Sequence, residues 1–311
     1  RRPPHNLGIP VSAAVAAHVR AFLDRDADAV LRAAADAAVR QPPESGRYLH
    51  ASSRETELVS AGTARSSFLV VEDRVTDRWQ AARPARDGSL VWTKRLGVRP
   101  LSDQDEQAWK AAGSPARVAG LSSTGKPRVA LRQAGAWKKS TVGIGKAGKQ
   151  AKIGTLGSQK VTMGVLKALP ADAGQLRETL LTRYQGDEAG ADLWLFGAAR
   201  DLLDGTLPVR PEVRAAAYRI LAEVDGVALL GPARDGQGRS GTAVAFDEPG
   251  NERGLVRHTL ILDEGTGRLL EAREMMLHPA PAYAKIPEGT VYDSVVYDHE
   301  WTDARPAAPR A

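Results

Sequence analysis

Apolar positions recur at two different spacings along the 311-residue chain, and the spacing changes several times. Apolar side chains three or four residues apart predict amphipathic helices, whereas alternation with polar residues predicts strands. Helical spacing runs through 12–39, 172–184, 188–203 and 211–224, and extended patterns occupy 48–58, 68–79, 89–96, 227–230, 242–246, 256–262, 269–277 and 291–297.

Local signals mark where several of these elements begin and end. Ser102 followed by Asp105 is an acidic variant of the capping box, and it predicts a short helix with Trp109 on its inner face. Pro211 stands where a first-turn proline is favoured, so a helix should begin there. The glycine-containing turns at 235–238 and 263–267 are short enough to join only antiparallel strands.

The order of the elements predicts the fold class. Strands, then helices, then strands again indicate an α+β fold rather than an alternating parallel one. We expect a curved antiparallel sheet, an open half-barrel, packed on helices. The expected regions are a helical segment at 1–41, a single α+β half-barrel domain at 42–300, a basic Gly/Lys-rich loop at about 138–157 within it, and a disordered tail at 301–311.

Charge is distributed unevenly. Between Gln107 and Ala171 the chain runs 65 residues without Asp or Glu while carrying 12 Lys and Arg, whereas elsewhere 31 basic residues face 37 acidic ones. Gathered charge of one sign repels itself, so this segregation predicts an anionic partner. Nine of the 11 lysines lie there, and hydrated ammonium groups suit diffuse attraction. The side chains expected to make the contact are Lys126, Arg128, Lys138, Lys139, Lys146, Lys149 and Lys152.

Composition and motifs exclude several classes of site. The absence of cysteine excludes disulfides, thiolate metal sites and cysteine nucleophiles. No window approaches the ~18 uninterrupted apolar residues of a membrane helix. The glycines at 143–148 match nucleotide-loop patterns, but no buried strand precedes them, so the match is accidental. We therefore expect no catalytic residue, no metal and no cofactor.

Two kinds of side chain leave alternatives open. The carboxylates at 293–303 could serve an envelope hydrolase, because the separation of a catalytic pair is set in space rather than along the chain. A nucleic-acid-binding protein would also explain the basic segment, although few aromatics there could stack on bases. Among the tryptophans, Trp79, Trp92, Trp109 and Trp194 are expected in the core, and Trp137 is expected to be exposed.

Several strings taken together resemble a known family. They are DEQAWKAAGSP at 105–115, LPAD at 169–172, RAAAYRILA at 214–222, DGQGRSG at 235–241, and LILD followed by TGRLL at 260–270. The set is similar to a family of uncharacterised extracytoplasmic proteins of high-GC Gram-positive bacteria, often encoded beside extracytoplasmic-function sigma factors. The resemblance implies an ectodomain anchored by an N-terminal membrane helix that this chain lacks. The element order also resembles the LolA, LolB and RseB half-barrels.

These observations together predict a non-catalytic extracytoplasmic binding or sensory module. Its ligand would be a lipid, a lipoprotein or a peptide, and its Lys-rich segment would contact an anionic lipid or wall polymer. An envelope protein is a further possible partner, and nucleic acid is a less favoured one. The side chains expected to line an apolar groove on the sheet are Phe68, Val70, Trp92, Phe246 and Leu260.

Overall fold

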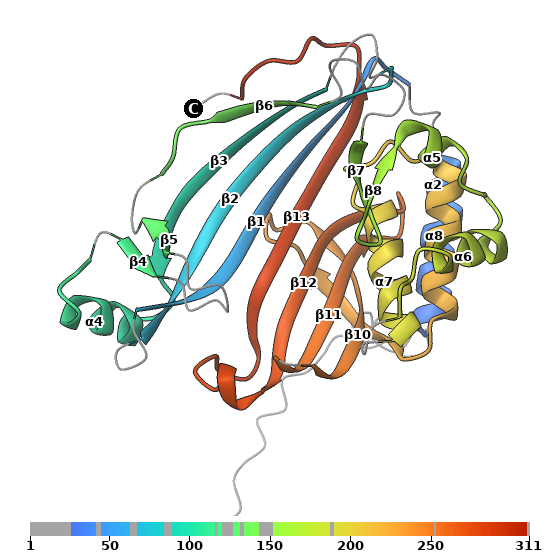
Figure 1. Ribbon diagram of the computed structural model, residues 1–311. Helices are drawn as coiled ribbons and strands as arrows, with labels where there is room; N and C mark the ends of the chain where they lie inside the picture. Colours follow the sequence, from blue (N-terminus) through green and yellow to red (C-terminus); the bar gives the residue numbers. More distant parts are fainter. Residues whose placement is uncertain are drawn as a thin grey trace, which may run out of the picture.

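The computed structural model describes residues 26–41, 45–62, 67–83, 89–115, 117–119, 127–130, 134–142, 152–186, 190–251 and 253–309. One antiparallel sheet of nine strands dominates it, in the order β6-β3-β2-β1-β13-β12-β11-β10-β9 (Figure 1). Within the described residues β6 and β9 are its two edges, so the sheet is not closed. The strands are β1 (Tyr48–Gly62), β2 (Ser67–Ala81), β3 (Ser89–Pro100), β6 (Lys138–Val142), β9 (Val227–Arg234), β10 (Ser240–Asn251), β11 (Gly254–Asp263), β12 (Arg268–Pro279) and β13 (Thr290–Thr302).

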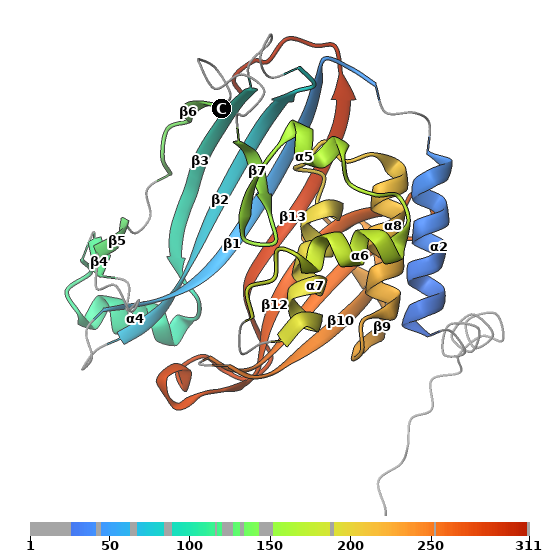
Figure 2. The ribbon, with the colours of Figure 1, turned by 45° about the vertical axis from the view of Figure 1, so that its right-hand side comes forward.

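Most helices gather against one face of this sheet, beside β10–β13, while β1–β3 extend beyond them (Figures 1 and 2). Helix α2 lies along α8, and α8 also contacts α6 and α7. Their buried side chains join those of β10–β13 in one apolar core, whose largest member is Tyr218. The helices are α2 (Ala27–Arg40), α4 (Asp103–Ala111), α5 (Met163–Lys167), α6 (Ala173–Leu181), α7 (Gly190–Leu203), α8 (Pro211–Glu223) and the 3-10 helix η2 (Pro281–Tyr283).

The predicted α+β class and antiparallel sheet are confirmed. The end signals are confirmed as well, because the side chain of Ser102 accepts a hydrogen bond from the Asp105 amide and Pro211 is the first residue of α8. Trp109 is buried on the inner face of α4. The predicted helix at 12–39 is observed only as α2, since residues 1–25 lie outside the described part.

The glycine-lysine region differs from the expected loop at its two ends. Lys138–Val142 forms β6, which pairs with β3, and Lys152–Leu156 (β7) pairs with Gln159–Thr162 (β8) in a separate hairpin. Ile153, Leu156 and Val161 are buried in the main core, and this apolar burial holds the hairpin in place. Residues 143–151, which contain the nucleotide-loop pattern, lie outside the described part.

Alternation along the strands gives the sheet two different faces. The helix-side face is the one on which α7 packs, and it carries Leu260 and Tyr297 in the main core. Beyond the helices, the same face of β1–β3 carries charged residues such as Glu55, Glu72 and Arg74. The opposite face is called the outer face below.

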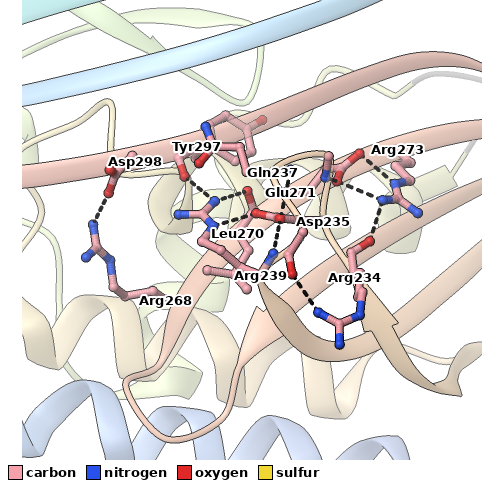
Figure 3. Close-up of polar contacts among 12 residues, drawn as sticks. Arg234, Asp235, Gln237, Arg239, Arg268, Leu270, Glu271, Arg273, Tyr297 and Asp298 are labelled. Carbon is pink, nitrogen blue, oxygen red and sulfur yellow. Dashed lines mark hydrogen bonds and ion pairs between the residues drawn. The ribbon is translucent and has the colours of Figure 1, made fainter.

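A polar network fastens the β9–β10 turn to the outer face (Figure 3). The buried carboxylate of Asp235 accepts hydrogen bonds from the amides of Gln237 and Arg239 and from the Arg239 guanidinium. The guanidinium also donates to the carbonyl of Tyr297, and the amide of Gly236 donates to Glu271. Because every group in it is bonded within the fold, we assign this network to stability rather than to ligand binding.

Candidate functional site

A depression of about 440 Å³ lies where α7 meets the turn of the β7–β8 hairpin. Its volume falls within the ~300–1,000 Å³ that ligand pockets usually occupy. The lining combines an indole, a guanidinium, a carboxylate and two hydroxyl groups with small residues: Thr155, Gly157, Ser158, Trp194, Gly197, Ala198, Arg200 and Asp201.

The hairpin wall of the depression depends on a left-handed turn. Gly157 and Ser158 have φ values of 53° and 68°, and a primed turn of this kind suits the twist of a two-stranded hairpin. The Gly157 amide donates to Oδ2 of Asp201 over 3.0 Å. A Cβ at position 157 would lie 2.3 Å from Cζ2 of Trp194, so only glycine allows this close approach.

The floor of the depression is a helical surface. Trp194, Gly197 and Asp201 are separated by three and four residues, which places them along one side of α7. No atom lies within 4 Å of the position that a Gly197 Cβ would take, so the missing side chain leaves open space there. The hollow therefore exists because a glycine interrupts the helix surface.

Arg200 connects this depression to a second hollow beneath α7. Its Nη2 donates to Oδ1 of Asp201 over 3.0 Å, and the same residue lines a cavity of about 30 Å³ against the sheet. Burial alone would lower the pKa of Arg200, but the Asp201 carboxylate and further neighbours outweigh it, so the pKa is raised. The cavity is also lined by His258, Glu274, Asp293 and Tyr297.

Two carboxyl groups near Arg200 hold their protons unusually strongly. Burial is the main cause that raises the pKa of Asp293 to about 7, and the charges of Glu274, Glu55 and Glu57 add to it. Burial also raises the pKa of Asp204 to about 7, with a further contribution from Asp201. Both groups therefore change charge near neutral pH.

Asp293 belongs to a row of ionisable side chains that crosses the sheet. Glu72 on β2 faces Glu57 on β1, Glu57 faces Asp293 on β13, and Asp293 faces Glu274 on β12. Like charges directly opposite one another destabilise a sheet. Arginines offset part of this repulsion in the pairs Arg74–Glu72 (3.2 Å), Arg95–Glu72 (2.6 Å) and Arg253–Glu274 (3.2 Å).

The five residues expected to line one apolar groove lie in three separate places. Phe68 and Val70 pack with Trp109 under α4, and Phe246 and Leu260 lie in the main core beneath the helices. Trp92 contacts Tyr48 and Trp79 in another cluster. All five are buried, and the structure does not bring them together.

The residues expected to contact an anionic surface are described only in part. Lys138, Lys139 and Lys152 are exposed, the first two on the edge strand β6. Arg128 lies on β5 (Pro127–Ala130), which pairs with β4 (Arg117–Ala119), and its side chain is outside the described part. Lys126, Lys146 and Lys149 also lie outside the described residues.

The C-terminal carboxylates do not all converge on one site, although Asp298 and Glu300 line one hollow together with His50. Asp293 lies on the helix-side face, whereas the neighbouring Asp298 lies on the outer face and pairs with Arg268 over 2.9 Å. Asp303 accepts a hydrogen bond from the Arg47 amide. No set of three or more metal-ligating side chains occurs in the described part of the chain.

The chain matches no family model and no curated protein sequence. Within the described residues, none of the helices combines the length and apolar character that crossing a bilayer requires.

Sequence reasoning placed Trp194 in the core, and the structure leaves it half-buried in the wall of the depression. Neither Arg200 nor Asp201 was singled out, because a single Arg-Asp pair in a helix is common. The available signal was the glycine at 197, which lies in an apolar helix between an indole and a charged pair.

Proposed function

We propose that this chain is a non-catalytic binding module that holds a peptide segment in the depression between α7 and the β7–β8 turn. The observation that carries the proposal is the depression itself, which offers an indole surface next to Arg200 and Asp201. A peptide suits this lining because it supplies apolar side chains together with main-chain donors and acceptors.

A peptide fits better than a lipid chain. On the helix-side face, the apolar side chains of β10–β12 are covered by helices, and Phe246 and Leu260 are buried there. Beyond the helices, the helix-side face of β1–β3 continues as a charged surface with the partly exposed residues Glu55, Arg74 and Arg95. A bound peptide could extend from the depression onto this polar surface, whereas an acyl chain would gain little by burial there.

The same proposal includes the finer architecture and the location. We place the fold with the LolA, LolB and RseB half-barrels, supported by the unclosed antiparallel sheet and by helices packed on one of its faces. Extracytoplasmic placement behind an N-terminal anchor is supported by the sequence resemblance described above.

The proposal is tested by panning a phage-displayed random dodecapeptide library against the immobilised chain. Gly197→Leu would place an isobutyl group in the depression, starting from a Cβ position that faces open space. Gly164→Leu is the matched control, since this exposed glycine lies on α5 outside the depression. We expect peptides enriched on the wild type to bind the control equally and Gly197→Leu at least roughly tenfold more weakly, a loss of about 1.4 kcal/mol.

Two outcomes would refute peptide binding at this site. The first is that no sequence is enriched above the level seen with Gly197→Leu. The second is that the enriched peptides bind Gly197→Leu as tightly as the wild type. Circular dichroism of the variant would show that the fold is intact.

A further inference from the structure

The lysines at the β3–β6 end of the sheet differ from the arginines elsewhere on it. Arginines of the outer face form ion pairs, such as those of Arg239 with Asp235 and Arg273 with Glu271 (Figure 3). By contrast, Lys94, Lys138 and Lys139 make no ion pair with any carboxylate of the described residues. Neither β3 nor β6 contains Asp or Glu. No carboxylate on either strand therefore offsets their positive charge.

Two of these ammonium groups lie next to indole rings. The Nζ of Lys139 is 5.7 Å from the ring centroid of Trp92, its direct partner across the β3–β6 pair. The Nζ of Lys94 is 5.7 Å from the ring centroid of Trp137. Contacts at this distance hold a cation over an aromatic ring while its other side stays available to solvent.

The same edge also presents apolar surface. Trp137 is half-buried rather than exposed as the sequence predicted, and it packs on a cluster that contains Trp79 and Trp92. Leu96 on β3 is 37% exposed and adds apolar surface to this edge. Lysine with a partly buried tryptophan and an exposed leucine is the combination found where proteins meet the headgroup layer of a membrane.

We infer that the β3–β6 edge of the outer face is a docking surface for anionic phospholipid headgroups. Charge complementarity supports this partner, because unpaired ammonium groups attract phosphate without a fixed geometry. Nucleic acid is less suited, since the rings of Trp79 and Trp92 are 8% and 5% exposed, which leaves the half-buried Trp137 as the indole of this edge that a base could reach. The docking surface is separate from the depression at α7 and does not depend on the proposed peptide binding.

On the outer face, the positive docking surface does not extend as far as β13. On β13, Asp298 and Glu300 are exposed and lie near His50 of β1, so the positive region ends before these strands. This arrangement predicts an oriented contact in which the β3–β6 edge approaches the bilayer first. It also gives a reason for lysine on an edge strand, where charged side chains prevent pairing with another sheet.

Binding to vesicles of phosphatidylcholine with and without phosphatidylglycerol tests the inference. The informative variant is Lys94→Gln with Lys139→Gln, and the control is Lys110→Gln with Lys167→Gln, which removes the same charge from exposed positions on α4 and α5. We expect partitioning onto anionic vesicles to fall roughly 30-fold in the first variant, since each near-surface cation contributes about fivefold. The control should fall less than about threefold, which is the part due to net charge alone.

Three results would overturn the inference. Equal binding of the wild type to both vesicle types would remove the electrostatic partner. An equal loss in both double variants would show that net charge acts without this surface. Tighter binding of a single-stranded oligothymidine at the same ionic strength, lost in the first variant only, would assign the surface to nucleic acid. Unchanged melting curves would show that both variants are folded.

Discussion

At the scale of single residues, the carboxyl group of Asp204 at the end of α7 has the clearest effect on how stability depends on pH. Its Oδ1 accepts hydrogen bonds from the amide and the hydroxyl of Thr206, both over 2.8 Å. Burial nevertheless dominates and raises the pKa from its ordinary value of 3.8 to about 7. The folded chain therefore keeps a proton that the unfolded chain releases.

This proton makes stability depend on pH in a defined direction. Because the pKa is higher in the folded state, the free energy of unfolding should decrease as pH rises from about 4 to about 7 and then level off. Asp204→Asn keeps the acceptor oxygen and removes the titration. Between pH 5 and pH 8 the free energy of unfolding of the wild type should fall by about 1.4 kcal/mol more than that of the variant, which is half of the roughly 2.7 kcal/mol that linkage gives for the two pH units from 5 to 7.

Urea denaturation at the two pH values measures this difference. Asp298→Asn is the control, because that carboxylate lies on the outer face and is mostly exposed. Parallel pH curves for the wild type and Asp204→Asn would contradict the assigned role of Asp204.

At the scale of elements, the contact between α7 and the β7–β8 hairpin shapes the site. Among the residues that the structure describes, no strand of the main sheet pairs with the hairpin, which is held by its buried apolar side chains and by the hydrogen bond from the Gly157 amide to Asp201. A small element of this kind keeps its position only if the contact with its neighbour is close.

Replacement of Gly157 tests this contact. Gly157→Ala places a methyl group against the Trp194 ring and also strains a residue with φ of 53°. We therefore expect the free energy of unfolding to fall by about 3 kcal/mol. Gly186→Ala is the matched control, because Gly186 has φ of 73° but no atom within 4 Å of its Cβ position. It should lose about 1 kcal/mol from backbone strain alone. Equal losses in denaturant melts would mean that the ring contact contributes nothing.

The sequence predicted which segments form helices and strands better than it predicted how those segments pack together to form the site. The periodicity around Tyr218 and the cap at Ser102 are local signals, and both were sufficient. The β7–β8 hairpin was missed because its glycines and lysines resemble a loop, and its apolar residues are explained only by burial against distant helices. The predicted apolar groove failed for a similar reason. The pairing of the strands places Trp92 and Phe246 in different parts of the sheet, and no local signal in the sequence shows this.

At the scale of the whole molecule, helices cover only part of the helix-side face, yet the chain should unfold as one unit. Leu31 of α2 is fully buried against the core that includes α8. Trp194 lies on α7 in that region, whereas Trp79 and Trp92 lie on the uncovered strands β2 and β3, so tryptophan fluorescence reports on both regions. The continuous sheet connects these two regions. A substitution that destabilises one region should therefore lower the unfolding midpoint of the other region as well.

Leu31→Ala tests this cooperativity. A cavity in the main core should lower the free energy of unfolding by about 2–5 kcal/mol. Tryptophan fluorescence and far-ultraviolet circular dichroism should report the same lowered midpoint, because both follow a single transition. Val39→Ala, at a position that is 46% exposed, should change the midpoint little. Two separate transitions would show that α2 and the helical layer form their own folding unit.

The most direct test of peptide binding at α7 is amide hydrogen exchange, measured with and without a saturating amount of a panned peptide. We expect slower exchange in 152–162 and 190–203, which form the two walls of the depression, and no such change in Gly197→Leu. Protection confined to other segments, or protection that survives in Gly197→Leu, would contradict it.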